Sequence, residues 1–166
     1  MHENAQQWVE RLGLGPHPEG GFFKETYRSD LNLPVSALGG DFSGGRSVST
    51  SIYYLLSGED FSALHRIRSD ELWHFYDGSP LVVQGLHPTG EREDWILHND
   101  PSGGHPQAIV AAGTWFGSRL QDPRGYALVG CTVAPGFDFS DFEMANREAL
   151  KSAYPEHADW IDSLTR

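Results

Sequence analysis

Apolar and polar residues alternate along most of the chain, and this pattern predicts a protein built mainly from short β-strands. Side chains in a strand point alternately to opposite faces, so a period of two residues indicates a strand with one buried face. Strands are predicted at residues 22–28, 47–56, 80–86, 95–97, 108–112, 114–120 and 126–133. Two more are predicted within residues 58–78, paired across a polar bend at residues 66–70.

Helices are predicted only near the two ends of the chain. Apolar residues at helical spacing followed by Gly13 predict a helix over residues 4–12. Residues 140–143 read Ser-Asp-Phe-Glu, a capping-box pattern that predicts a helix starting at Ser140, and Pro155 starts a second helix. Residues 29–46 are rich in Gly, Pro, Ser and Asp, and we interpret them as a long loop, a lid or a dimer arm. His17 lies between two prolines and is expected to be a solvated loop residue.

The alternation within residues 58–78 decides which side chains can meet. His65 and Ile67 share one face of the first strand. In the second strand Glu71 and Trp73 share one face, whereas His74 points to the opposite face. A His and a Glu that project from neighbouring strands onto one face can form a polar site.

Composition favours a single domain over residues 1–166. Nine Phe, six Tyr and five Trp supply enough large side chains for a core, and 19 Gly with 10 Pro favour a sandwich or barrel of short strands. The net charge of −11 argues against nucleic-acid binding, which needs clustered Lys and Arg. Cys131 is the single cysteine, and its apolar neighbours predict a buried, inert thiol.

The sequence shows no targeting or membrane signal. The first seven residues have neither a basic region nor an apolar run, so no signal peptide is predicted. No run approaches the roughly 18 apolar residues of a membrane span. We therefore expect a cytoplasmic protein with neither membrane nor nucleic acid as a partner.

Residues 58–78 resemble the first motif of the cupin superfamily. That motif has Gly, a His-x-His pair, Glu and Gly in this order; the matching residues are Gly58, His65, Glu71 and Gly78, and Ile67 stands at the second histidine. Residues 19–28, 51–56, 112–115 and 133–143 are similar, in order, to the branch of the superfamily classed as a domain of unknown function. The resemblance implies a double-stranded β-helix, or jelly-roll barrel, with short N- and C-terminal helices and a pocket in the barrel mouth.

The resemblance also implies where a metal would bind. Cupin metal sites usually use both histidines and the Glu of the first motif, plus a His from a second motif. Ile67 and Phe116 stand at two of these four positions, which leaves His65 and Glu71. A divalent transition metal normally takes three or more protein ligands, so no metal or other cofactor is expected.

Cupins of this branch resemble epimerases that act on nucleotide-linked ketosugars without a metal, with a His as base and a Tyr as acid. The resemblance implies a metal-independent isomerase or epimerase of a sugar-like or carbonyl compound. His65 would be the base and Glu71 its orienting partner. Tyr53 and Tyr54 lie on opposite faces of their strand, so one of them should face inward; we assign Tyr53 as the acid.

Six further residues are candidates for contact with a small-molecule ligand. They are cationic or aromatic side chains of the predicted strands: Lys24, Tyr27, Arg28, Arg66, His74 and Trp115. Each has a structural alternative, since residues 22–28 could be an ordinary surface strand, His74 an interface histidine and Trp115 a structural tryptophan. A homodimer is also expected, because jelly rolls of this family commonly pair near the N-terminal segment.

Two other functions stay open. A non-catalytic, storage-like cupin would bind a small polar ligand in the same pocket without turnover. A metal-dependent cupin enzyme with an incomplete ligand set is the third hypothesis, and His65 and Glu71 would be its ligands.

Elemental analysis of protein produced without a chelating tag tests whether a metal is bound. We expect no stoichiometric transition metal, because only two of the four ligand positions hold a donor side chain. One metal ion per chain would contradict this prediction and favour oxygenase or metal-isomerase chemistry.

Overall fold

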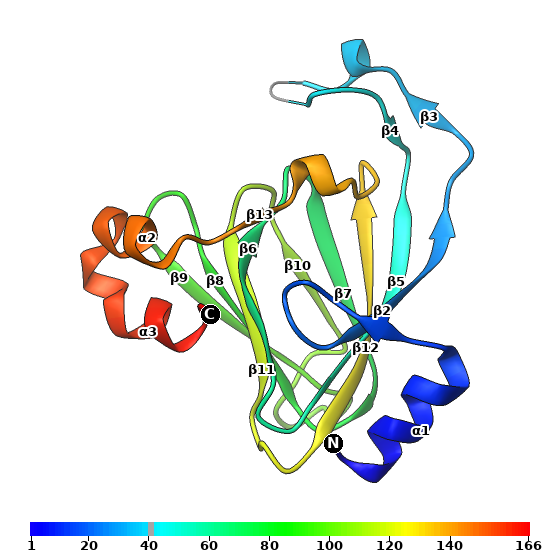
Figure 1. Ribbon diagram of the computed structural model, residues 1–166, viewed down its shortest axis with the longest axis vertical. Coiled ribbons are helices and arrows are strands. Elements are labelled where there is room, and N and C mark those ends of the chain that lie inside the picture. The colour runs from blue at the N-terminus through cyan, green and yellow to red at the C-terminus, as the bar shows by residue number, and fades with distance from the viewer. Residues whose placement is uncertain (40–41) are drawn as a thin grey trace.

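Two antiparallel β-sheets packed face to face form the body of the molecule, which the computed structural model describes over residues 1–39 and 42–166 (Figure 1). The six-stranded sheet has, in spatial order, β1 (Gly15–Pro16), β2 (Phe22–Arg28), β5 (Thr50–Ser57), β12 (Tyr126–Ala134), β7 (Asp70–Gly78) and β10 (Gln107–Val110). The five-stranded sheet has β13 (Glu143–Met144), β6 (Phe61–Arg66), β11 (Trp115–Leu120), β8 (Leu81–Leu86) and β9 (Arg92–Leu97). The predicted mainly β jelly roll is confirmed.

Short helices cover the outside of the barrel, as predicted (Figure 1). α1 (Glu3–Leu12) packs against the outer side of β5 and β12 and ends at Gly13, whose φ of 63° is left-handed. Near the other end of the chain, α2 (Arg147–Ala153), η3 (Pro155–His157) and α3 (Ala158–Ser163) pack against the five-stranded sheet. Within residues 1–39 and 42–166, no helix is long and apolar enough to cross a membrane.

The predicted helix start at Ser140 is wrong. η2 (Phe139–Asp141) is a single 3₁₀ turn, and α2 begins later, after an Asn146 side-chain cap. Glu143 lies in β13, which pairs with β6, and its carboxylate accepts a hydrogen bond from Arg66 Nε at 2.8 Å. Strand pairing and this ion pair therefore keep the segment extended despite its capping-box pattern.

The hydrophobic core fills the space between the two sheets. It consists of inward-facing side chains from both sheets, and the largest of them include Tyr54, Trp73, Phe75 and Phe116. Trp73 and Phe75 share the inward face of β7 as the alternation predicts. At the mouth of the barrel the core borders a cavity whose lining includes a few polar side chains.

The expected pairing of the two strands within residues 58–78 is also wrong. β6 pairs with β11 and β13, whereas β7 pairs with β12 and β10. The bend at residues 66–70 connects the two sheets. β6 and β7 therefore face each other across the core and do not pair. His65 and Glu71 therefore face the barrel interior from opposite sheets.

A small hairpin extends from the mouth of the barrel (Figure 1). It contains β3 (Asn32–Leu33), η1 (Val35–Ala37) and β4 (Arg46–Ser47), and β3 pairs with β4. Its location corresponds to the predicted loop at residues 29–46, of which residues 40–41 lie outside the described part. Its role as a lid or dimer arm stays a prediction.

A buried ion pair fastens this hairpin to the barrel mouth. The Arg46 guanidinium donates to both carboxylate oxygens of Asp141, at 2.6 Å each, and both side chains are about 5% exposed or less. A third hydrogen bond, from Arg46 Nη2 to Ser140 Oγ, is 2.9 Å long. β4 and η2 are thus held together by one guanidinium.

Arg46→Met should lower the free energy of unfolding by about 3 kcal/mol, because it removes both short hydrogen bonds to the buried Asp141 carboxylate and leaves the longer, 3.6 Å contact with the more exposed Arg68 Nε. Urea unfolding followed by circular dichroism measures this. Arg124→Met is the matched control: it removes the exposed ion pair with Asp122 and should leave stability unchanged. Equal stabilities of the two variants would contradict the prediction.

Candidate functional site

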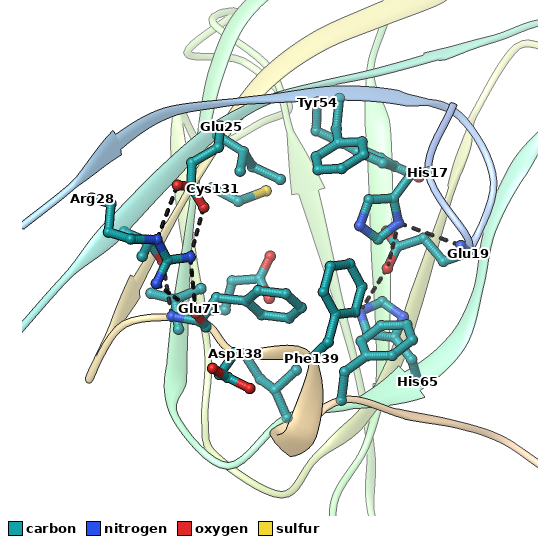
Figure 2. A pocket seen from close by; sticks show the side chains of 17 residues that line it. His17, Glu19, Glu25, Arg28, Tyr54, His65, Glu71, Cys131, Asp138 and Phe139 are labelled. Carbon is teal, nitrogen blue, oxygen red and sulfur yellow. Dashed lines mark hydrogen bonds and ion pairs between the residues drawn. The ribbon is translucent and has the colours of Figure 1, made fainter. Parts of the chain in front are cut away.

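A cavity of about 270 Å³ opens between the two sheets at the mouth of the barrel (Figure 2). Its volume is close to the lower end of ligand sites, about 300 Å³, and suits a small metabolite. Its lining is mainly apolar with a few polar groups, and consists of His17, Glu19, Phe23, Glu25, Arg28, Thr50, Ile52, Tyr54, His65, Ile67, Glu71, Cys131, Val133, Phe137, Asp138, Phe139 and Phe142.

Glu19 is the central polar group at one end of the cavity. Its Oε2 lies 3.1 Å from His65 Nε2 and 3.5 Å from His17 Nδ1, and its Oε1 accepts a hydrogen bond from Ser62 Oγ at 2.9 Å. Figure 2 shows the carboxylate between the two imidazole rings. All three side chains are at most 7% exposed, so a carboxyl group and two imidazoles share one dry environment.

A tight turn places His17 and Glu19 in this position. The backbone N–H of His17 donates to Gly21 O at 3.0 Å, closing the turn between β1 and β2. Gly21 has φ of 70°, and a Cβ at this position would lie only 2.6 Å from Leu55 O. Glycine is therefore required where the chain turns back toward β5.

The tautomer of His65 follows from its contacts. Nδ1 lies 2.8 Å from the carbonyl oxygen of Ala63, which accepts a proton and cannot donate one. Nδ1 therefore carries the proton, and in the neutral ring Nε2 is an acceptor that faces Glu19. Burial lowers the pKa of His65 to about 4, so the ring is neutral at pH 7.

Burial also raises the pKa of the Glu19 carboxyl group, although the nearby His17 lowers it. Glu19 Oε2 lies 3.1 Å from His65 Nε2, so one proton can lie between the two buried groups when Glu19 is protonated. That neutral state costs less than an isolated carboxylate in a site of low dielectric constant.

Glu71 reaches the cavity from the opposite sheet. Its side chain is buried on β7, and burial together with the neighbouring Glu19 raises its pKa to about 8. The thiol of Cys131 is its hydrogen-bond partner, and burial raises the pKa of that thiol well above its usual value. At neutral pH Glu71 is therefore a carboxylic acid, and the predicted inert thiol is buried beside it.

The outer part of the cavity has an aromatic wall and one cation. Phe137, Phe139 and Phe142 contact one another, with ring centroids 5.0–6.1 Å apart. Arg28 lies at the rim, where it forms a 2.7 Å ion pair with Glu25 and donates to Phe137 O. The entrance therefore combines apolar contact surface with a charge that is already paired.

Three of the predicted site residues line this cavity: His65, Glu71 and Arg28. Lys24 instead donates to Leu12 O at the end of α1, and Tyr27 is exposed on β2. Neither residue is in the cavity lining.

The other three predicted ligand contacts also lie elsewhere. Arg66 stacks on Trp115, 4.4 Å from the ring centroid, and Trp115 packs beneath the C-terminal helices. His74 is on the outer face of β7, where Nε2 lies 3.2 Å from Thr132 Oγ1. The alternation of strand side chains explains these positions, since each of these residues has a neighbour that points inward instead.

The structure corrects the roles assigned to tyrosine and to the orienting carboxylate. Tyr53 contacts Tyr76 on the outer side of the sheet, whereas Tyr54 lines the cavity, in phase with the inward Ile52. The Tyr54 hydroxyl donates to Gly20 O at 2.8 Å, and burial raises its pKa well above the usual value, so it is a poor acid. The carboxyl partner of His65 is Glu19, not Glu71.

Sequence reasoning missed two of the central residues. His17 was expected to be solvated, but its side chain is 7% exposed and its ring contacts Phe23 edge-on at 4.4 Å. Glu19 comes from the same turn and begins the family-like segment 19–28, but a turn-rich stretch of Pro and Gly has no period that would place its side chain inside the barrel. The phase of Tyr54 with Ile52 could have been read from the alternation.

The donor set does not fit a metal. Both ring nitrogens of His65 already have partners, and the neighbouring positions hold Ile67 and Phe116, whose side chains cannot be ligands. No group of three or more His, Cys, Asp or Glu side chains in the described residues is placed to hold a metal ion. We therefore derive no chemistry through a bound metal.

Glu71 should make stability depend on pH. Because its pKa is higher in the folded protein than in the unfolded chain, the folded state keeps a proton that the unfolded state releases, and stability falls as the pH rises toward about 8. Glu71→Gln should remove a slope of at most about 1.4 kcal/mol per pH unit between about pH 6 and pH 8. Urea unfolding across this pH range measures the slope. The exposed control Glu59→Gln should keep the wild-type slope. A wild-type slope in Glu71→Gln would contradict the assignment.

Comparisons with known proteins agree with the fold. Protein SO0799 from Shewanella oneidensis has a structure with a TM-score of 0.86 and 37% sequence identity, covering 98% of this chain and 97% of its own. A hypothetical protein from Leishmania major also has a TM-score of 0.86, with 33% identity and coverage of 97% and 98%. The yeast protein YML079W from Saccharomyces cerevisiae is 29% identical over 148 residues, which are 83% of this chain and 73% of that protein.

More distant structures share only the fold. Bacillus subtilis oxalate decarboxylase has a TM-score of 0.54 at 14% identity, and the match covers 90% of this chain but 36% of that enzyme. The family model described as cupin superfamily (DUF985) matches residues 6–145. The chain therefore belongs to the DUF985 family of the cupin superfamily.

Proposed function

We propose that this cupin is a metal-independent isomerase or epimerase of a small, uncharged carbonyl compound. The observation that carries the proposal is geometric: the His65–Glu19 pair and Glu71 face one small cavity from opposite sheets. An enzyme that moves a proton next to a carbonyl group needs one base and one acid on either side of its substrate.

The protonation states suit these two roles at neutral pH. The His65–Glu19 pair has a neutral imidazole and can accept one more proton, so we assign it as the base; burial lowers the pKa of His65 to about 4, so the pair gives the proton back readily. Glu71 is protonated and can donate, so it is the acid. Environments that push the pKa values of two cavity groups apart in this way are typical of acid–base enzymes.

The reaction follows from these roles. The base takes the proton on the carbon next to the carbonyl group, and the electrons of that C–H bond form the C=C bond of an enol. Glu71 gives its proton to the carbonyl oxygen and becomes a carboxylate. Return of a proton to the neighbouring carbon gives the isomer, and return to the opposite face of the same carbon gives the epimer.

The cavity also limits the ligand. Of its 17 lining residues, Arg28 is the one Lys or Arg, and Glu25 pairs with it at the rim. An anionic group deep in the cavity would lie beside Glu19 and Glu71 without a cation, which is costly. A volume of about 270 Å³ holds a sugar-sized molecule, so the nucleotide of a nucleotide-linked sugar would have to stay outside.

A second function, non-catalytic binding, has one observation in its favour. Both nitrogens of His65 are engaged within the protein, as in a structural histidine. A storage-like cupin would bind the same neutral ligand with no proton transfer. The expected homodimer and cytoplasmic location stay predictions under either function.

Deuterium exchange distinguishes the two functions. The protein is incubated in D₂O with aldoses and ketoses of three to six carbons, and NMR follows deuterium entry next to the carbonyl group and formation of isomer or epimer. We expect exchange with at least one compound, and Glu71→Gln should slow it about 100-fold or more because the acid is lost. The surface control Glu59→Gln should keep the wild-type rate.

Exchange that is equally fast in Glu71→Gln would contradict the role of Glu71. Saturable binding of these compounds with no exchange in any of them would favour the non-catalytic cupin.

A further inference from the structure

His17 lies across Glu19 from His65 and is the second imidazole of the cavity (Figure 2). Its Nδ1 is turned to Glu19, so Nε2, on the far edge of the ring, is turned to the cavity interior. Within the described residues, no hydrogen bond of His17 Nε2 to another protein group is found. His65 differs, because Ala63 O and Glu19 occupy both of its nitrogens. A ligand in the cavity thus meets His17 Nε2 as an available imidazole nitrogen.

The contacts of His17 Nδ1 allow either tautomer. Nδ1 lies 3.3 Å from the backbone N–H of Glu19, which is a donor, and 3.5 Å from Glu19 Oε2, which can accept. If Nδ1 accepts from the backbone, Nε2 carries the proton. If Nδ1 donates to the carboxyl group, Nε2 has a lone pair that faces the cavity. Nδ1 therefore has a partner in both tautomers. Uptake of a proton from a ligand at Nε2 uses the second tautomer.

We infer that His17 is the catalytic residue that exchanges a proton with the substrate, and that Glu19 passes that proton on to His65. This inference rests on the proposed function and changes its detail. His65 remains the final proton acceptor, but it acts through Glu19 and does not touch the substrate.

The transfer balances over three groups. His17 Nε2 takes the proton from the substrate carbon, and the C–H electrons stay on the substrate as the enol double bond. The proton on His17 Nδ1 moves to Glu19 Oε2, and the proton that Glu19 held moves to His65 Nε2. The result is a neutral His17, a neutral Glu19 and an imidazolium at His65, while Glu71 has become a carboxylate across the cavity. The reverse transfers restore all four groups when the product forms.

Short contacts support the relay over a purely structural role for the three side chains. One carboxyl oxygen, Glu19 Oε2, lies within 3.5 Å of both rings, so a single atom connects them. Ser62 Oγ holds the other oxygen, and this fixes the carboxyl plane. Packing alone would be satisfied by apolar side chains next to Phe23 and Phe142.

Variants of the two histidines test the order of the relay in the deuterium-exchange assay. His17→Gln keeps an N–H near the position of Nε2 but cannot take a proton, so we expect the exchange rate to fall at least 100-fold with little change in KM. His65→Gln should lower the rate by about tenfold, because His17 can still take the substrate proton and hold it as an imidazolium beside Glu19. His105→Gln, at an exposed histidine, is the control and should match the wild type. Urea unfolding of each variant confirms that it is folded.

Retention of at least one third of the wild-type rate by folded His17→Gln, with a large loss in His65→Gln, would overturn the inference, because His65 would then contact the substrate itself.

¹⁵N NMR of protein labelled at histidine decides the tautomers without any turnover. At pH 7 we expect His65 to show a fixed neutral ring with its proton on Nδ1, and His17 to show shifts averaged between two tautomers. Addition of dihydroxyacetone should move His17 Nε2 more than either nitrogen of His65. A single fixed tautomer of His17, unchanged by dihydroxyacetone, would overturn the inference. If no compound undergoes exchange, the proposed function fails while these NMR shifts still decide the position of His17.

Discussion

The site depends on the burial of Glu19 between two imidazoles. A carboxylate without a cation would be costly at this depth, and so would an unpaired imidazolium. The two costs are avoided together when one proton lies between Glu19 and His65, with the ring held by the Ala63 carbonyl. A shared proton keeps the pair neutral, so three titratable side chains can lie next to one another in a cavity lined mainly by apolar atoms.

The fold brings this cluster together from the turn before β2 and from two strands that belong to different sheets. The turn before β2 supplies His17 and Glu19, β6 supplies His65, and β7 supplies Glu71 from the opposite sheet. Because the chain crosses between sheets at residues 66–70, two residues close in sequence end up on facing walls. The barrel thus places titratable side chains on two facing walls of one cavity.

The resemblance to cupins predicted the jelly roll, and alternation predicted the shared buried face of His65 and Glu71, because alternation is a property of strands with one buried face. They could not predict which strands pair or which carboxyl group contacts His65. Alternation does not say which sheet a strand joins, and this is why β6 and β7 were expected to pair. Turn residues carry no period, so alternation does not indicate that His17 and Glu19 fold into the cavity, although Glu19 begins the family-like segment 19–28. Ile52 and Tyr54 are two residues apart and share one face of β5. Alternation therefore favours Tyr54 over Tyr53 as the tyrosine of the cavity.

The ion pair between Arg46 and Asp141 has a consequence for the kinetics of ligand exchange. Asp141 ends the η2 turn, and the first residue of that turn, Phe139, forms part of the aromatic entrance. The entrance is therefore attached to the β3–β4 hairpin, which extends from the barrel mouth (Figure 1). A displacement of this hairpin would be transmitted through the Arg46–Asp141 ion pair to Phe139 at the entrance.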